Sequence, residues 1–156
     1  MRKIKIVLAS FAALLLVIQL IPVSRDNPLP EEVVPAPDDV IAVLERSCFD
    51  CHSHETRWPW YAHVAPASWL VAKDVNEGRR HLNFSTWNRY DAEKRADKLE
   101  DIWEEIEGGQ MPLKIYLPLH PSARLSEQDR AVIHEWTVAA RRVIQHPSDS
   151  TGSDES

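Results

Sequence analysis

Cys48-Phe49-Asp50-Cys51-His52 is the one stretch of this chain whose side-chain chemistry is not explained by core packing. Cys48 and Cys51 are the only cysteines, so neither is used elsewhere. They lie about one helical turn apart, which places both sulfurs on the same side of the backbone. His52 follows the second cysteine directly and can swing beneath the two sulfurs.

The Cys-x-x-Cys-His spacing predicts covalent attachment of one c-type haem. On this prediction the thiols of Cys48 and Cys51 add across the two vinyl groups of the porphyrin. His52 is then the proximal ligand of the iron.

Three other interpretations compete with haem attachment. A thioredoxin-like redox pair needs a βαβ pattern, and none surrounds the motif. A structural disulfide across three residues closes a loop too short to restrict the unfolded chain much. Half of a zinc site, completed by His52 or His54, lacks a second ligand pair at zinc-finger spacing.

Composition limits the chain to one domain of ordinary size and argues against nucleic acid as a partner. The chain has 156 residues, of which 44% are hydrophobic and 27% charged, as in globular proteins. Three of the 18 basic residues precede residue 24, and all 24 acidic residues follow it, so residues 24–156 carry a formal charge of −9. Phosphate contacts require a basic face.

Residues 1–23 are predicted to be a signal-anchor or transmembrane segment. Arg2, Lys3 and Lys5 precede a nearly unbroken apolar run over residues 6–21. The exit from this run has no small-x-small cleavage site, and the basic start predicts the N-terminus inside. We expect a single pass through the cell inner membrane with the domain on the periplasmic side. A cleaved signal, which would leave a soluble periplasmic protein, is the alternative.

The segments that flank the domain differ from it in composition. Residues 24–37 are rich in proline and acidic residues and predict an extended linker. Residues 147–156 are polar and acidic and predict a disordered tail. The domain itself is expected over residues 38–146.

Helical periodicity in the domain predicts an all-α fold of about four short helices with long loops around one haem. The first helix runs from Asp38 or Asp39 toward Cys48, with Ile41, Leu44 and Cys48 on one face. Pro66 opens a second helix, which Arg79, Arg80 and His81 close. Two further patterns have N-caps and apolar stripes. The helix capped by Asp91 carries Ala92, Ala96, Leu99, Ile102, Trp103 and Ile106, and ends at Gly108-Gly109; the helix opened by Ser126 and Asp129 carries Ile133, Trp136, Ala140, Val143 and Ile144.

These elements together resemble a small class I cytochrome c. The features are a helix leading into the Cys-x-x-Cys-His motif, a Gly-x-Met-Pro strap at residues 109–112, and a last helix with an inward Trp136. More closely, the motif followed by Glu55-Thr56-Arg57-Trp58-Pro59-Trp60-Tyr61, Ala65-Pro66, Ser68-Trp69 and His120-Pro121 is similar to the bacterial haem-binding domain family. The resemblance implies an exported mono-haem protein, commonly anchored in the membrane.

Met111 is the leading candidate for the sixth ligand of the iron. It is the only methionine besides the initiator, and the glycines before it allow the backbone to approach a cofactor. A methionine that fills a gap in the core is the ordinary alternative. His120, His63 and His81 are the other candidate ligands.

Other side chains near the motif are candidates for contact with the haem. Arg57, Trp58, Trp60 and Tyr61 are candidates for the haem wall or for propionate contacts, since buried propionates need donors and a cation. Ordinary loop packing explains each of them equally well. His54, His134 and His146 are expected to be exposed, and Arg79 and Arg80 to form a solvated helix end.

Two functions from different classes follow from the site. With His52 and Met111 both bound, the iron has no open position, and the protein is an electron carrier rather than an enzyme. A redox partner protein with a basic docking face would match the acidic charge. A haem-based sensor or peroxidase-like enzyme instead needs an open or labile sixth position, with a distal acid-base group such as His81 or His120.

Overall fold

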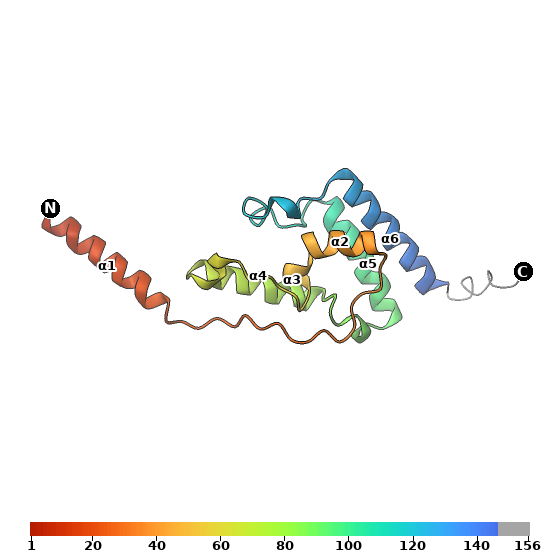
Figure 1. Ribbon diagram of the computed structural model, residues 1–156, viewed down its shortest axis with the longest axis horizontal. Helices are drawn as coiled ribbons and strands as arrows, with labels where there is room; N and C mark the ends of the chain where they lie inside the picture. Colours follow the sequence, from red (N-terminus) through yellow and green to blue (C-terminus); the bar gives the residue numbers. More distant parts are fainter. Residues whose placement is uncertain (147–156) are drawn as a thin grey trace, which may run out of the picture.

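The computed structural model describes residues 1–146, so the predicted tail lies outside the described residues. The described chain is all-helical, as predicted, and its one isolated β-bridge joins Glu32 to Thr86. Figure 1 shows the arrangement. The α-helices are α1 (Arg2–Ile18), α2 (Asp38–Ser47), α3 (Phe49–His52), α4 (Ala67–His81), α5 (Ala92–Glu107) and α6 (Glu127–Gln145), and the short 3-10 helices are η1 (Trp60–His63), η2 (Trp87–Arg89) and η3 (Pro121–Ala123).

The main core lies where α2, α5 and α6 pack together. α5 and α6 lie against each other, and α2 crosses them (Figure 1). Leu44 from α2, Leu99 from α5 and Ile133 from α6 are almost completely buried there, and the predicted inward Trp136 is buried beside them. Each helix thus buries its apolar stripe in one shared core.

The ends of α5 and α6 were predictable from local signals. The Asp91 carboxylate accepts a hydrogen bond from the Lys94 amide and caps α5. Ser126 and Asp129 form a complete capping box at the start of α6. Gly109, at φ +66°, carries the chain away from the end of α5.

Two predicted core positions are wrong, whereas the first helix ends next to Cys48, as predicted. Ala92, the first residue of α5, and Val143 are both exposed. Val143 lies at the edge of the apolar stripe of α6, whereas its neighbour Ile144 packs against the core. The first helix stops at Ser47 because the backbone of Cys48 leaves the helical conformation (φ −126°, ψ −38°), and α3 starts again at Phe49. This break turns the motif away from the axis of α2.

The N-terminal helix α1 projects from one end of the molecule (Figure 1). Among residues 1–146 no helix is long and apolar enough to span a membrane, and α1 has 17 residues. The Gln19 side chain at its end pairs with the backbone of Ala65, donating to the carbonyl at 3.1 Å and accepting from the amide at 2.8 Å.

The proline-rich segment after α1 is extended but is not a free spacer. It runs along the domain before entering α2 (Figure 1). Val34 is buried in the core, and its amide donates to the carbonyl of Phe84 at 3.0 Å. Glu31 forms an ion pair with Arg89. Hydrogen bonds and one apolar anchor therefore fix this segment to the residues that follow α4.

Arg79 corrects the expectation of a solvated helix end. Its half-buried guanidinium donates to the carbonyls of Ser53 and Asp26, both at 2.7 Å. It also donates to the Asn27 side chain at 2.8 Å and to the Thr56 hydroxyl at 2.9 Å. Arg80 is exposed and pairs with Glu77, as a solvated helix end would.

Candidate functional site

A cavity of about 540 Å³ lies between the motif and α4 on one side and α5 on the other. Its size is in the range of pockets that hold small molecules and cofactors. The motif, α4, α5 and the loop after α5 all contribute to its walls. The lining residues used below are Ser47, Cys48, Asp50, Cys51, His52, Asp74, Glu77, Gly78, His81, Leu82, Phe84, Lys98, Asp101, Glu105, Met111 and Tyr116.

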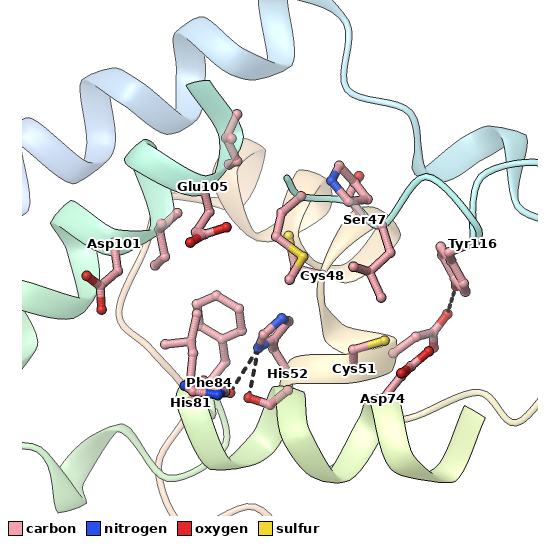
Figure 2. Close-up of a pocket in the computed structure, with 18 of the residues that line it drawn as sticks. Ser47, Cys48, Cys51, His52, Asp74, His81, Phe84, Asp101, Glu105 and Tyr116 are labelled. Atoms are coloured by element: carbon pink, nitrogen blue, oxygen red, sulfur yellow. Dashed lines mark hydrogen bonds between the residues drawn. The ribbon is translucent and has the colours of Figure 1, made fainter. Parts of the chain in front are cut away.

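Both cysteines and the histidine of the motif face this cavity. Figure 2 shows the sulfurs of Cys48 and Cys51 and the ring of His52 directed into the same open space. The break at Cys48 and the single turn of α3 produce this arrangement. The three side chains that sequence spacing alone brings near one another therefore also share one wall of one cavity.

The His52 ring is held by two backbone carbonyls from the end of α4. Its Nδ1 lies 3.0 Å from the Gly78 oxygen and 3.1 Å from the Leu82 oxygen (Figure 2). Carbonyls only accept, so Nδ1 carries the proton, and the lone pair lies on Nε2. Burial lowers the pKa of His52, although the two carbonyls oppose this shift. The result is a neutral imidazole whose Nε2 is free to bind a metal.

Gly78 allows α4 to lie close enough to the motif for that bond. A Cβ at Gly78 would lie 2.5 Å from the carbonyl oxygen of Cys51, closer than real Cβ contacts come. Any side chain there would push α4 away from α3. The same residue supplies one of the two carbonyls that hold His52.

Met111 lies on the cavity wall formed by the loop after α5. Its amide and that of Gln110 both donate to the carbonyl of Glu105, at 3.1 and 2.9 Å. The left-handed turn at Gly109 makes this possible. The end of α5 therefore fixes the backbone of Met111, and Met111 and His52 line the same cavity.

The structure bears on the competing interpretations of the motif. Cys48 and Cys51 are both free thiols. Burial raises the pKa of Cys48 to about 12, and burial, together with Asp50 and Asp74, raises the pKa of Cys51 to about 11. Reactive dithiol pairs show the opposite shift.

The zinc interpretation required His52 or His54 as a further ligand. His54 is turned to the Leu29 carbonyl and the Asn83 side chain. Within residues 1–146, no three His, Cys, Asp or Glu side chains group closely enough to hold a metal ion.

Comparison with protein families agrees with this geometry. The model of a family described as a haem-binding domain matches residues 13–139, which is more than half of the chain.

The chain belongs to the haem-binding domain family.

No curated protein and no solved structure matches the chain. The cytochrome c-like arrangement of the fold therefore stays a prediction, and so does covalent attachment of the haem.

The cavity of this haem-binding domain fits such a group. Two thiols and a neutral imidazole occupy one wall, which is the donor set that a covalently held haem needs. The Ser47 hydroxyl, on the same cavity, is buried and has no hydrogen-bond partner among the described residues. A buried hydroxyl without a partner is uncommon, and a polar edge of a bound group would satisfy it.

The four residues expected to contact the haem lie elsewhere on the haem-binding domain. Arg57, Trp60 and Tyr61 line a neighbouring, mainly apolar cavity of about 290 Å³, and Trp58 lines neither cavity. The Arg57 side chain is 73% exposed, and Trp60 is 76% exposed. Their contact with haem stays a prediction.

Of the three histidines proposed as alternative iron ligands, one lines the cavity of about 540 Å³ and two do not. His81 lines the main cavity, whereas His63 and His120 do not. His120 stacks on Tyr116, with ring centroids 3.8 Å apart. His81 is therefore the alternative to Met111 that shares the cavity with His52.

Sequence patterns missed several residues that build the site. Ser47, Gly78, Leu82 and Phe84 all line the cavity. Phe84 is buried, and its ring packs against those of Phe49 and His52. A signal was present in one case: Gly78 is a glycine inside a helical pattern, which usually marks a close approach.

Proposed function

We propose that this haem-binding domain holds one haem covalently through Cys48 and Cys51, with His52 and Met111 as ligands of its iron, and that it transfers electrons. The observation that carries the proposal is the meeting of these four side chains at one cavity. Haem, when bound, supplies a one-electron iron couple.

The protein's own residues would position the ligands and limit access to them. The two carbonyls behind His52 fix its orientation and tautomer. The end of α5 fixes the backbone of Met111. A thioether favours Fe(II), so Met111 would raise the reduction potential relative to a second histidine. With both His52 and Met111 holding the iron, no position would stay open for a substrate, which favours a carrier over a catalyst.

Covalent attachment has a direct test. The full chain, produced in a host that matures c-type haem, should keep one haem per chain in denaturing mass spectrometry. Cys48→Ala together with Cys51→Ala should release it. A bare wild-type chain from the same host would contradict covalent attachment.

The role of Met111 is tested by its replacement in the same holoprotein. Met111→Ala should open the sixth position, so that the spectrum becomes high-spin, cyanide binds faster and the reduction potential falls. Leu117→Ala is the matched control, because Leu117 lies on the same loop but outside the cavity. It should keep the low-spin spectrum of the wild type.

Two other outcomes would change the proposed function. If Met111→Ala keeps the wild-type spectrum and potential, Met111 is a packing residue and His81 becomes the next candidate. If the wild type is already high-spin, the sensor or peroxidase-like alternative replaces the carrier.

The redox partner is proposed to carry a basic docking face. Five carboxylate residues line the cavity, Asp50, Asp74, Glu77, Asp101 and Glu105, against Lys98 and His81. Electron exchange with a basic partner should therefore slow as salt is added, because screening weakens attraction between opposite charges.

Export and membrane attachment through residues 6–21 are proposed on separate grounds. Covalent haem attachment takes place outside the cytoplasm, and the basic start orients the chain. The apolar side chains of α1 are largely exposed, so they are available to lipid. The haem protein should remain with the membrane fraction, and an N-terminus near residue 24 in the mature protein would show a cleaved signal instead.

A further inference from the structure

The loop that carries Met111 is tied directly to α3, the short helix that carries Cys51 and His52. We name residues 110–120 the Met111 strap. The Tyr116 hydroxyl donates to Asp50 Oδ2 at 2.7 Å, and this bond appears in Figure 2 at the label Tyr116. Asp50 lies in α3, between the two cysteines of the motif. One hydrogen bond therefore joins the two sides of the main cavity.

Hydrogen bonds from residues 56 and 57 fix the position of Asp50. Its Oδ1 accepts from the Arg57 amide at 2.8 Å, and its own carbonyl accepts from the Thr56 hydroxyl at 2.8 Å. The side chain is 20% exposed, so water competes only partly for its oxygens. A hydrogen bond to a carboxylate is among the stronger kinds in proteins.

The Tyr116 ring is held by a second contact, its stacking on His120. It stacks on His120 with the rings 6° from parallel, and His120 Nδ1 lies 3.2 Å from the Tyr116 carbonyl. The Tyr61 hydroxyl lies 3.4 Å from the same nitrogen. In the described part of the chain, Tyr116–Asp50 and His120–Tyr61 are the side-chain hydrogen bonds that tie residues 112–120 to other segments.

The strap is thus fixed at two points with Met111 close to the first. The carbonyl of Glu105 holds the backbone at Gln110 and Met111. Tyr116 holds it again five residues later, after a turn in which its amide donates to Leu113 at 2.9 Å. Releasing the second point would leave His120–Tyr61 as the side-chain hydrogen bond that ties residues 112–120 to another segment in the described part of the chain.

We propose that the Tyr116–Asp50 hydrogen bond is a latch that keeps the Met111 strap closed over the cavity, and that Tyr116 is a positioning residue for Met111. The latch sets how often the strap opens, and so how fast an external ligand reaches the site. This role rests on the ligation by Met111 proposed above.

Tyr116→Phe in the full-length holoprotein tests the latch. The variant keeps the ring that stacks on His120 and removes only the hydroxyl. Cyanide should bind to the ferric protein about tenfold faster, because one hydrogen bond to a charged group no longer opposes opening. Amide exchange at Met111 and Tyr116 should rise by a similar factor, which reports strap opening independently of the iron.

Thr137→Val is the matched control. It removes a hydroxyl that donates to the His134 carbonyl at 3.0 Å within α6, outside the residues that line the cavity. It should leave the rate of cyanide binding within about twofold of the wild type, which separates release of the strap from general loss of stability.

The outcomes separate the latch from the proposed ligation. If Met111→Ala speeds cyanide binding and Tyr116→Phe does not, Met111 is a ligand and the latch is wrong. If both variants leave cyanide binding unchanged, the ligation and the positioning role fail together. If Tyr116→Phe changes neither cyanide binding nor amide exchange, the strap is held by other contacts and the latch is overturned.

Discussion

Arg79 joins three parts of the molecule through one side chain. From α4 it reaches the carbonyl of Ser53 after the motif, the Thr56 hydroxyl, and the extended segment at Asp26 and Asn27. The planar guanidinium can serve several acceptors at fixed angles, which a lysine ammonium on a flexible stem cannot reproduce. The position of the residues after His52 therefore depends partly on this arginine.

Arg79→Lys should lower the free energy of unfolding by about 1 to 2 kcal/mol, since most of the four hydrogen bonds are lost and the site is only half buried. Arg80→Lys is the neighbouring control, and its exposed pair with Glu77 should cost less than about 0.5 kcal/mol. Urea unfolding followed by circular dichroism measures both. Equal effects of the two substitutions would show that the hydrogen bonds of Arg79 stabilise the fold no more than the exposed ion pair of Arg80 does.

The contact between α3 and α4 governs the geometry of the site. Gly78 lies against the carbonyl of Cys51, and the carbonyls of Gly78 and Leu82 hold His52. The helix that orients the imidazole is therefore the same helix that packs on the motif. A small separation of α3 and α4 would disturb packing and the orientation of the imidazole together.

Gly78→Ala should destabilise the protein, although alanine is the better helix former. Crowding against Cys51 should cost about 1 to 3 kcal/mol, and the gain in helix propensity should return only about 1 kcal/mol. Thermal unfolding of the holoprotein should show a lower midpoint. Asn76→Ala, at an exposed position in α4, should leave the midpoint unchanged or raise it slightly. A Gly78→Ala protein as stable as wild type would mean that α3 and α4 can separate freely.

The haem-binding domain has two parts that differ in how much apolar core they share. α2, α5 and α6 share a continuous apolar core. The packing of α4 is mainly with α3 and η1, and the main cavity separates it from α5. A bound group in that cavity would supply contacts that the protein itself does not make across it.

Protein made without haem should therefore lose order in α4 first. Hydrogen exchange should show α4 amides exchanging much faster than in the holoprotein, while those of α5 and α6 stay protected by their shared core. The unfolding midpoint should also be lower than that of the holoprotein. Equal protection of α4 with and without haem would show that the protein preorganises the cavity completely.

Local sequence signals were enough to predict the helical class, the caps of α5 and α6, and the motif that lines the cavity. These features are local, because a cap joins residues three apart and an amphipathic stripe repeats within one element. The cysteine spacing is equally local. The predicted caps of α5 and α6 matched the structure, whereas no local signal predicted the break between α2 and α3 at Cys48.

The surroundings of those residues depend on contacts between distant parts of the chain. The carbonyls that hold His52 lie 26 and 30 residues further along the chain, and Asp50 meets Tyr116 across 66 residues. Val34 enters the core from a segment whose composition indicated a spacer. Contacts over such separations depend on how elements pack, and the spacing in a single sequence does not identify the two partners of such a contact. For that reason the cavity, the bond between Asp50 and Tyr116 and the hydrogen bonds of Arg79 became visible only in the folded chain.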